Sequence, residues 1–386
     1  MKKIVGILLI IAITGALFTG CGTGSPASSA DEIKIGINYE LSGGVATYGQ
    51  SSVEGIELAL EQINAAGGVN GKKLKAVKYD TKSEPAEATT LASKLMTRDK
   101  VVAVLGPATS GSFKATIPVA EKNKIPVASG SATADDVTYD SNGVKDYAFR
   151  ICFSDSTQGD VMATYALQNL SKKNAVIIKD SSSDYAKGLA ASFKKTFEAG
   201  GGAIVAEEAY LDNDTDFNAI ITSIKGKDFD VIFIPGYYEE VGLIIKQARA
   251  QGINQPILGA DGFDSPELKN LAGAKALNDV YFSNHYSSLD TNPTVVEFIE
   301  TYKKKYNKQP DAFAALGYDL ARYVADAIGR AEKPDGESVK KALEETKDFD
   351  GVTGTFSIDD KHNAVKAIVV IGLKDGEQST IDKITK

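Results

Sequence analysis

Short apolar runs alternate with helical patterns along most of the chain. The runs rich in β-branched residues predict buried strands at residues 33–41, 73–80, 101–106, 175–180, 203–211, 230–236 and 256–261. Between them, apolar positions recur three and four residues apart and predict helices at residues 51–65, 85–97, 185–199 and 239–251. Strands that alternate with helices run parallel, because a parallel pair needs a long crossover connection. The pattern therefore predicts an α/β fold.

These strand and helix units fall into two sets, one before about residue 150 and one after it. Residues 293–331 follow with a helical pattern and no intervening strand, and residues 351–360 and 364–376 end the chain as a β-rich pair. We therefore expect two doubly wound parallel-sheet lobes rather than one large sheet. The extra helices predict a chain that returns to the first lobe and ends near the second, with several hinge crossings.

Two turns in the first set carry small hydroxyl residues. The sequence GPATSGS at residues 106–112 follows one predicted strand, and residues 131–133 follow the next strand, IPVASG. In parallel α/β sheets, ligands bind beyond the carboxyl ends of the strands, where helix N-termini offer free N–H groups. The two turns together could hold one carboxylate. Alternatively, their Ser and Thr residues only cap helices.

Strands of the second set end in polar or aromatic residues. Residues 181–184 and Tyr185 follow one strand, residues 237–238 follow another, and a third ends on Asp261. A carboxylate at a strand end can neutralise the ammonium group of a ligand. In the alternative interpretation, Asp261 merely caps the helix that begins near Pro266.

The N-terminus has the pattern of a lipoprotein signal peptide. A positive MKK start precedes an apolar run at residues 4–18, and small residues then lead to Cys21. The run is too short to span a membrane comfortably, and small residues suit a signal peptidase. We expect a signal peptide at residues 1–20 and a lipidated Cys21 that begins a flexible linker at residues 21–31. This places the protein at a bacterial cell membrane, anchored by lipid on the extracytoplasmic face. An ordinary secretory signal with a chance cysteine is the alternative.

Composition and motifs exclude several functions. The chain has 43 Lys and Arg against 51 Asp and Glu, a net charge of −8, which argues against nucleic acid as a partner. His285 and His362 lack the spacing of a metal site or a serine triad, and no G-x-S-x-G elbow occurs. We therefore expect no enzyme, no metal and no cofactor. With Cys21 lipidated, Cys152 has no disulfide partner and is expected to be a small buried strand residue.

The motifs together resemble those of the branched-chain amino-acid (Leu/Ile/Val) binding proteins of ABC importers. The segments that carry the resemblance are YELSGGVATYGQSSVEGIELALEQINAAGGVNGKKL, YD before a Pro-containing helix, GPATSGS, SGSAT, DYAKGLA, PGYYEEVGLIIKQAR and GADGF. The resemblance covers residues 31–386. It implies a type I periplasmic-binding-protein fold, in which two lobes joined by three hinge crossings close around one ligand. Lobe 1 would comprise residues 32–151 and 286–354, and lobe 2 residues 152–285 and 355–386.

The resemblance also implies roles for single residues. Ser110 and Thr133 would hold the α-carboxylate of an amino acid, with the backbone of Ser131 and Ala132 nearby. Asp261, together with Thr133, would hold the α-ammonium. The cleft and its side-chain pocket would be lined by Tyr48, Thr109, Tyr185, Tyr237 and Phe313.

The chain departs from the family pattern at some positions. Founding members have Glu at the place of Asp261, and some relatives pair a cysteine at the place of Thr109 in a disulfide that this chain cannot make. Ordinary aromatic packing is the alternative role of Tyr48 and Phe313. Glu40 could reach a polar ligand end, but we expect it to be a solvated charge at a strand end.

The resemblance implies an extracytoplasmic solute-binding protein that delivers an amino acid, branched-chain or small aliphatic, to the permease subunits of an ABC importer. We expect a monomer. A receptor for an amide, a urea or an aromatic acid on the same scaffold is one alternative. The ligand-sensing partner of a signalling receptor is another.

Overall fold

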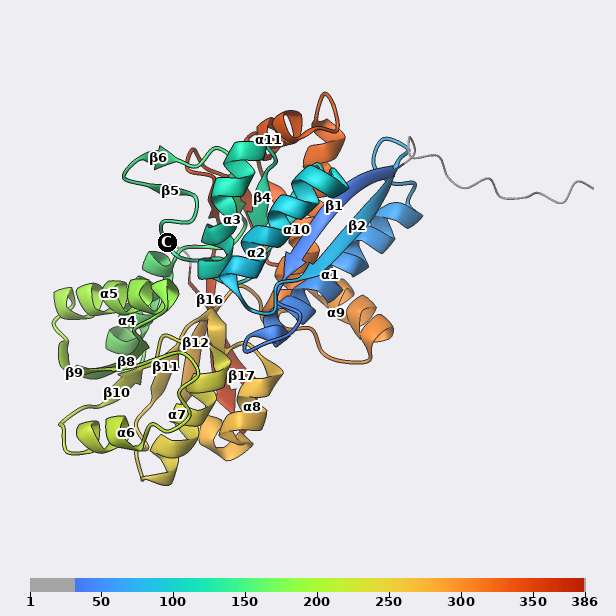
Figure 1. Ribbon diagram of the computed structural model, residues 1–386. Coiled ribbons are helices and arrows are strands. Elements are labelled where there is room, and N and C mark those ends of the chain that lie inside the picture. Colours follow the sequence, from blue (N-terminus) through green and yellow to red (C-terminus); the bar gives the residue numbers. More distant parts are fainter. Residues whose placement is uncertain (1–31, 385–386) are drawn as a thin grey trace, which may run out of the picture.

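The computed structural model describes residues 32–384, which form two α/β lobes side by side (Figure 1). The predicted signal peptide, Cys21 and the linker lie outside these residues. Within residues 32–384, no helix is long and apolar enough to cross a membrane. The predicted fold of two parallel-sheet lobes is confirmed.

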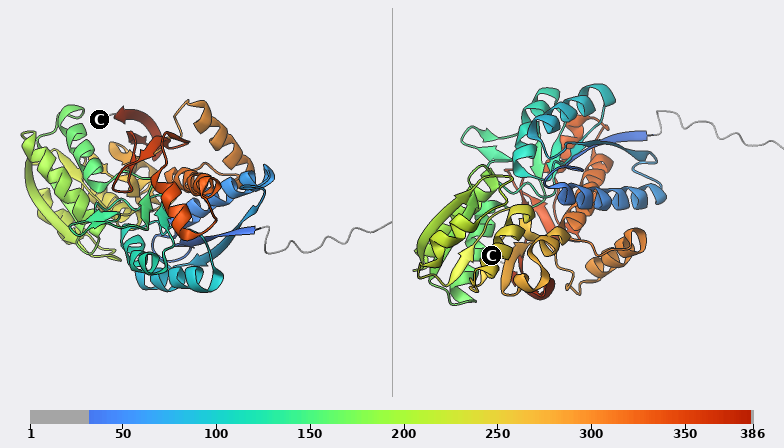
Figure 2. Two further views of the ribbon diagram at one scale, coloured as in Figure 1. Left: turned by 90° about the horizontal axis from the view of Figure 1, so that it is seen from above. Right: turned by 60° about the horizontal axis from the view of Figure 1, so that its bottom comes forward.

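The first lobe is built on a five-stranded parallel sheet. Its strands lie in the order β2 (Lys73–Asp80), β1 (Glu32–Tyr39), β3 (Val104–Leu105), β4 (Val127–Ser129) and β7 (Ala148–Arg150). Two pairs of helices cover its opposite faces (Figure 2), namely α1 (Ala46–Ala65) with α10 (Ala312–Arg330), and α2 (Pro85–Lys94) with α3 (Ser110–Asn123). The remaining elements near this lobe are a π-helix (Leu95–Asp99), α9 (Pro293–Tyr306), α11 (Gly336–Glu344), the hairpin β5 (Tyr139–Asp140) and β6 (Gly143–Val144), and a small sheet of β13 (Phe349–Gly351), β14 (Gly354–Ile358) and β15 (Ala364–Val365).

The second lobe is built on a seven-stranded sheet with two antiparallel strands at one edge. The strand order is β17 (Glu377–Ile384), β16 (Ile368–Lys374), β12 (Val280–Asn284), β11 (Ile257–Gly259), β10 (Val231–Phe233), β8 (Asn174–Asp180) and β9 (Ala203–Tyr210). Its helices are α4 (Asp155–Gln168), α5 (Asp184–Ala199), α6 (Asn218–Lys225), α7 (Tyr238–Ala250), α8 (Pro266–Ala272) and the short 3₁₀ turns Asp261–Phe263 and Ala274–Leu277. The chain passes between the sheets at residues 150–155, 284–293 and 358–368.

Some elements differ from the sequence expectation. The strand expected at residues 101–106 is only Val104–Leu105, because the N–H of Val101 still bonds to Leu95 and closes the preceding helix. Helix α1 begins at Ala46, five residues before the predicted start. The sequence pattern did not predict this start, because Gly49 lies in the first turn and glycine usually weakens a helix. Here glycine is required, because a Cβ at this position would collide with the carbonyl of Glu40.

Cys152 is buried, as expected, but it lies two residues beyond β7 rather than within a strand. Burial raises the pKa of its thiol to about 12. The thiol therefore stays protonated at neutral pH and packs as a small apolar group.

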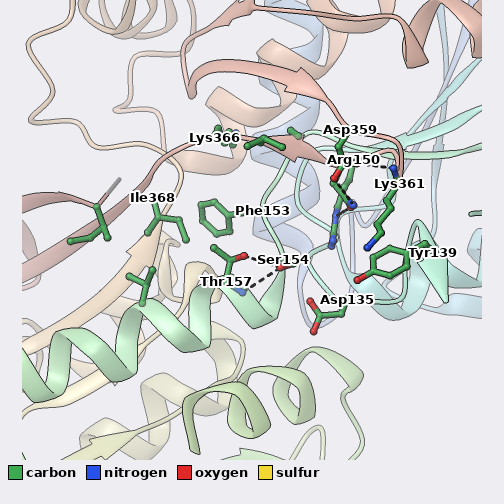
Figure 3. Close-up of a pocket in the computed structure, with 15 residues that line it drawn as sticks. Asp135, Tyr139, Arg150, Phe153, Ser154, Thr157, Asp359, Lys361, Lys366 and Ile368 are labelled. Carbon is green, nitrogen blue, oxygen red and sulfur yellow. Dashed lines mark hydrogen bonds between the residues drawn. The ribbon is translucent and has the colours of Figure 1, made fainter. Parts of the chain in front are cut away.

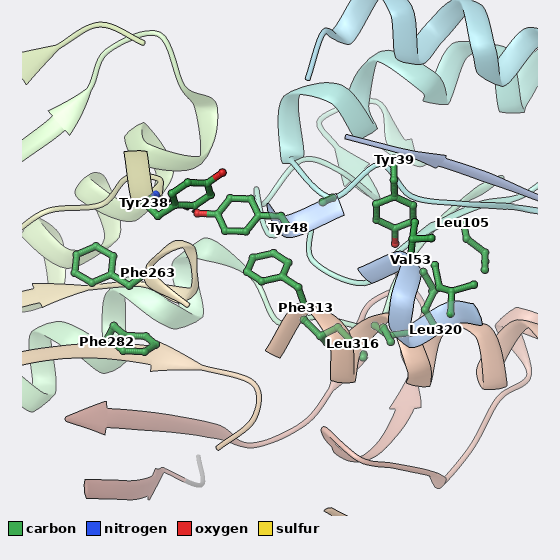
Figure 4. Packing of buried hydrophobic residues seen from close by; sticks show 14 of the residues in the cluster. Tyr39, Tyr48, Val53, Leu105, Tyr238, Phe263, Phe282, Phe313, Leu316 and Leu320 are labelled. Carbon is green, nitrogen blue, oxygen red and sulfur yellow. Dashed lines mark hydrogen bonds between the residues drawn. The ribbon is translucent and has the colours of Figure 1, made fainter. Parts of the chain in front are cut away.

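Helices α1 and α10 cross in direct backbone contact. A Cβ at Gly55 of α1 would collide with the carbonyl oxygen of Ala314, and one at Gly317 of α10 would collide with that of Ser52. The close approach lets apolar side chains of both helices, including Val53 and Leu320, pack together under the sheet (Figure 4). The two glycines therefore set the distance between the helices that support the first lobe.

We expect Gly55→Ala to lower the free energy of unfolding by about 1–3 kcal/mol, because the added methyl forces the helices apart. Alanine normally favours a helix by about 1 kcal/mol over glycine, so a loss of stability would identify the collision. Gly329→Ala, in the partner helix α10, is the matched control, since the nearest neighbour of the added methyl would be a Val69 methyl at 3.5 Å. Urea unfolding of both variants measures the difference, and equal stabilisation by both would contradict the prediction.

Candidate functional site: a cleft between the lobes

A small cavity, about 220 Å³ with the open space at its mouth, lies where the strand-to-helix turns of the two lobes meet. It is lined by Tyr48, Ala108, Thr109, Ser131, Tyr185, Tyr237, Asp261, Gly262 and Phe313. The structure thus brings together all the residues expected to line the cleft, along with Ser131 and Asp261. Ser110, Ala132 and Thr133 do not line the cavity, but each lies within two residues of one that does.

The two lobes touch on either side of this cavity. The hydroxyl of Tyr48 in α1 donates to the carbonyl of Gly262 and accepts the N–H of Tyr238 at 3.2 Å. The hydroxyls of Thr47 and Ser265 lie 2.9 Å apart, and the Tyr238 hydroxyl donates to the carbonyl of Gly44 at 2.9 Å. These contacts join α1 of the first lobe to turns of the second, so the structure has the lobes closed.

Aromatic rings form the walls of the cavity. Tyr48 stacks on Phe313 with ring centroids 4.2 Å apart, and its edge meets Tyr238 (Figure 4). On the opposite lobe, Tyr185 stacks on Tyr237 at 5.0 Å. The walls are therefore largely apolar, with the polar groups gathered at the turns.

Asp261 is the acidic group on the cavity wall and is 4 % exposed. One carboxylate oxygen accepts the hydroxyl of Tyr185 at 2.8 Å and the amide of Gln158 at 3.1 Å. The other oxygen lies 3.1 Å from Nε2 of His285. Helix α8 is capped by Ser265, so the alternative interpretation of Asp261 as the cap of that helix is wrong.

His285 contacts Asp261 on the side away from the cavity lining and contributes one of its hydrogen bonds. Its side chain is fully buried and stacks on Phe153 with centroids 3.6 Å apart. Burial lowers the pKa of the imidazole to about 4, against an ordinary value of 6.5. At neutral pH the ring is uncharged, and it donates its Nε2–H to the aspartate.

Glu40 is not the solvated charge that the sequence suggested. It is fully buried, and its carboxylate accepts the N–H groups of Ala108 at 2.9 Å and Thr109 at 3.1 Å, as well as the Thr109 hydroxyl at 2.9 Å. The end of β1 adjoins the turn after β3, so the free amides before helix α3 capture a carboxylate of the chain itself. Burial raises the pKa of Glu40.

Donors for a ligand anion remain beside Glu40. Within the described residues, the backbone N–H groups of Ser110 and Thr133 have no acceptor, and the Ser110 oxygen accepts Ala134 N–H at 3.0 Å, leaving its own proton to donate. No side chain caps α3, and residues 131–133 precede no helix directly. The alternative that these hydroxyls serve only as helix caps is therefore wrong.

Asp155 does not line the cavity but lies near enough to Asp261 to feel its charge, and the sequence did not single it out. It begins α4 and is fully buried, and neither carboxylate oxygen has a hydrogen-bond partner among residues 32–384. The Thr133 hydroxyl likewise has no partner within hydrogen-bond distance, although it lies near enough to Asp155 to lower the pKa of that carboxyl in part. Burial first, and then the charge of Asp261, still raise the Asp155 pKa well above its ordinary value. In the sequence, an aspartate in the first turn of a helix indicates only helix stabilisation.

Comparison with known proteins identifies the family. A family model described as periplasmic binding protein matches residues 32–378. The chain belongs to this family. A leucine-, isoleucine-, valine-, threonine- and alanine-binding protein of Pseudomonas aeruginosa is 30% identical over 340 residues, 88% of this chain and 89% of the relative. The resemblance to branched-chain amino-acid binding proteins is thereby confirmed.

Two solved structures of this family are similar along nearly their whole length. A branched-chain amino-acid transporter substrate-binding protein of Streptococcus pneumoniae, in complex with isoleucine, has 42% identity and a TM-score of 0.87, covering 92% of this chain and 99% of that chain. A leucine-binding protein of Thermotoga maritima has 34% identity and a TM-score of 0.84, covering 92% and 98%.

We expect the imidazole of His285 to titrate near pH 4. The folded protein resists its protonation while the unfolded chain accepts a proton near pH 6.5, so this group destabilises the fold as pH falls from 6.5 towards 4. Proton NMR can follow it, because the chain has only two histidines and His362→Gln assigns the signals. A midpoint near 6.5 for His285 would show that burial does not lower its pKa and would contradict the prediction.

Proposed function

We propose that this protein is the extracytoplasmic solute-binding receptor of an ABC importer, and that it holds an amino acid, branched-chain or small aliphatic, between its lobes. The observation that carries the proposal is the pair of unpartnered polar groups, the Asp155 carboxylate and the Thr133 hydroxyl, buried beside Asp261. Buried polar groups are nearly always hydrogen-bonded, so these groups call for a ligand that donates hydrogen bonds.

An α-ammonium group fits this place best. It brings a positive charge and three N–H donors, which can be shared among Asp155, Thr133 and Asp261. An amide or urea supplies donors but no charge, and would leave two buried carboxylates unneutralised at high cost. An aromatic acid would add a further negative charge.

The α-carboxylate would lie at the first lobe. The N–H groups of Ser110 and Thr133 and the Ser110 hydroxyl are the donors available there. Glu40 already occupies the N–H groups of Ala108 and Thr109. The ligand carboxylate would therefore be held one residue further along the turn than Glu40.

The side chain of the ligand would lie among Tyr48, Tyr185, Tyr237 and Phe313. These aromatic rings favour an apolar group on the ligand. The isoleucine bound to the Streptococcus pneumoniae relative supports a branched aliphatic side chain.

Closure of the lobes would distinguish the ligand-bound protein from the empty protein for the permease. The contacts of Tyr48 with Gly262 and Tyr238 form only when the lobes meet, so a ligand that bridges the turns favours the closed form. We propose residues 32–151 and 286–354 as one closing body and residues 152–285 and 355–386 as the other, with the protein acting as a monomer.

We also propose that Cys21 carries a lipid that anchors the protein outside the cell membrane. Wild-type protein should then fractionate with membranes, whereas Cys21→Ser should be released or retain its signal peptide. Wild-type protein that is free in the medium and begins well after residue 21 would disprove lipid anchoring.

The ammonium site can be tested by calorimetric titration with leucine, valine and alanine. Asp155→Asn and Asp261→Asn each remove one partner of the buried ammonium charge. Each should therefore cost about 3–5 kcal/mol of binding free energy, so that affinity for the best ligand falls more than about a hundredfold. Ser110→Ala should cost less, about 1–3 kcal/mol, because backbone N–H groups still hold the carboxylate.

Asp326→Asn, on the exposed face of α10, is the control and should bind as the wild type does. Benzoate and 4-methylpentanamide complete the titration series, because they represent the aromatic-acid and amide alternatives. If either binds more tightly than every amino acid, or if Asp155→Asn and Asp261→Asn leave leucine affinity unchanged, the amino-acid proposal is wrong.

A further inference from the structure

A second cavity lies at the hinge and shares no lining residue with the cleft (Figure 3). Its volume is about 890 Å³, including the space at its mouth. The lining comes from residues 135–161 around the first chain crossing and from residues 359–368 of the third, with Ile384 of β17. Both crossings therefore shape this cavity, which the proposed function does not use.

Three cations line the cavity without an ion pair in the described part of the chain: Arg150, Lys361 and Lys366. Arg150 is 1 % exposed, and its guanidinium donates to neutral acceptors. These are the side-chain oxygen of Asn363 at 2.6 Å, the carbonyls of Thr133 and Ala134 at 2.8 Å and that of Ala132 at 3.4 Å. These hydrogen bonds orient the guanidinium but do not neutralise its charge.

The two lysines differ in their surroundings. Lys366 donates to the hydroxyl of Thr353 at 2.8 Å, and this hydroxyl donates to the buried carboxylate of Asp319 at 2.7 Å. Burial lowers the pKa of Lys366 to about 8, and the charge of Asp319 partly offsets this shift. The Lys361 ammonium lies over the Tyr139 ring, 4.4 Å from its centroid. Figure 3 shows Arg150, Lys361 and Tyr139 gathered at one end of the cavity.

Two carboxylates also line the cavity, but neutral donors hold them. Asp135 accepts the N–H and hydroxyl of Ser156 at 3.2 and 2.8 Å, and Asp359 accepts the N–H groups of Lys361 and Asn363 at 2.9 and 2.8 Å. Both acids on this wall are thus held by donors of the protein, whereas Arg150 and Lys361 form no ion pair within the described residues. Cations that lack an ion-pair partner favour an anion.

The other end of the cavity is apolar. Phe153 and Ile368 lie there, opposite the cationic end (Figure 3), and Val161 and Ile384 complete the wall. An inorganic anion would leave this wall in contact with water. A ligand with an apolar tail would cover it and gain free energy from the buried area.

We propose that the hinge cavity binds a small organic carboxylate with an apolar tail. The carboxylate lies between Arg150 and Lys361, and the tail lies against Phe153, Val161 and Ile368. Arginine suits this role because its planar guanidinium matches the geometry of a carboxylate.

The probe is 3-methylbutanoate, titrated into the full-length protein by calorimetry. We expect saturable binding that Lys361→Ala weakens about fivefold, the effect of losing a partly exposed charge pair. Lys374→Ala removes an exposed lysine outside the cavity and should leave the affinity unchanged. Circular dichroism confirms that each variant is folded.

Two further ligands separate the parts of the proposal. The alcohol 3-methylbutanol has the tail without the charge, and inorganic phosphate has the charge without the tail, so both should bind more weakly than the carboxylate. The proposal is overturned if 3-methylbutanoate fails to saturate, if Lys361→Ala binds it as tightly as wild type, or if either analogue binds equally well. None of these variants touches the cleft, so leucine titration of the same proteins tests the proposed function separately.

Discussion

The parallel direction of the strands is the constraint on which the rest of the structure depends. Every strand that is followed by a helix ends at the same edge of its sheet, so the turns after β1, β3 and β4 meet in the first lobe, and those after β8, β10 and β11 meet in the second. Because the two edges face each other, residues as distant in sequence as Tyr48 and Gly262 come into contact. The direction and order of the strands are therefore enough to form the cleft, whichever side chains line it.

Burial then divides the polar groups at this cleft into two kinds. Glu40 and Asp261 are buried carboxylates whose oxygens are satisfied by the protein, the first by backbone N–H groups and the second by Tyr185, Gln158 and His285. The Asp155 carboxylate and the Thr133 hydroxyl are buried without such partners in the described residues. The satisfied groups keep the turns rigid, while the unsatisfied ones distinguish a ligand with a charged donor from one without.

Sequence patterns predicted much of this arrangement and missed specific parts of it. The strands, the turns at residues 106–112 and 131–133, and the position of Asp261 followed from periodicity and from the rule that ligands bind at the carboxyl ends of strands. The position of Glu40 did not, because its burial depends on amides that lie 68 residues away. Asp155 was missed for a similar reason, since an aspartate at a helix start is common and only the surrounding structure removes its partners. Gly49 and Gly55 show the same limit, because their effect arises from backbone contacts across elements.

The bonds of Arg150 have a consequence for how the molecule reaches its folded state. This guanidinium fixes the carbonyls of Thr133 and Ala134, but its own orientation depends on the side chain of Asn363. Helix α10, which packs on α1, likewise begins only at Ala312. A chain that emerges N-terminus first can form the strands of its first sheet early, yet it must wait for more than half of its length before these partners arrive. Folding is therefore governed by contacts between distant segments, which are slow to form, and the unfinished first lobe would need protection until the C-terminal segment is delivered.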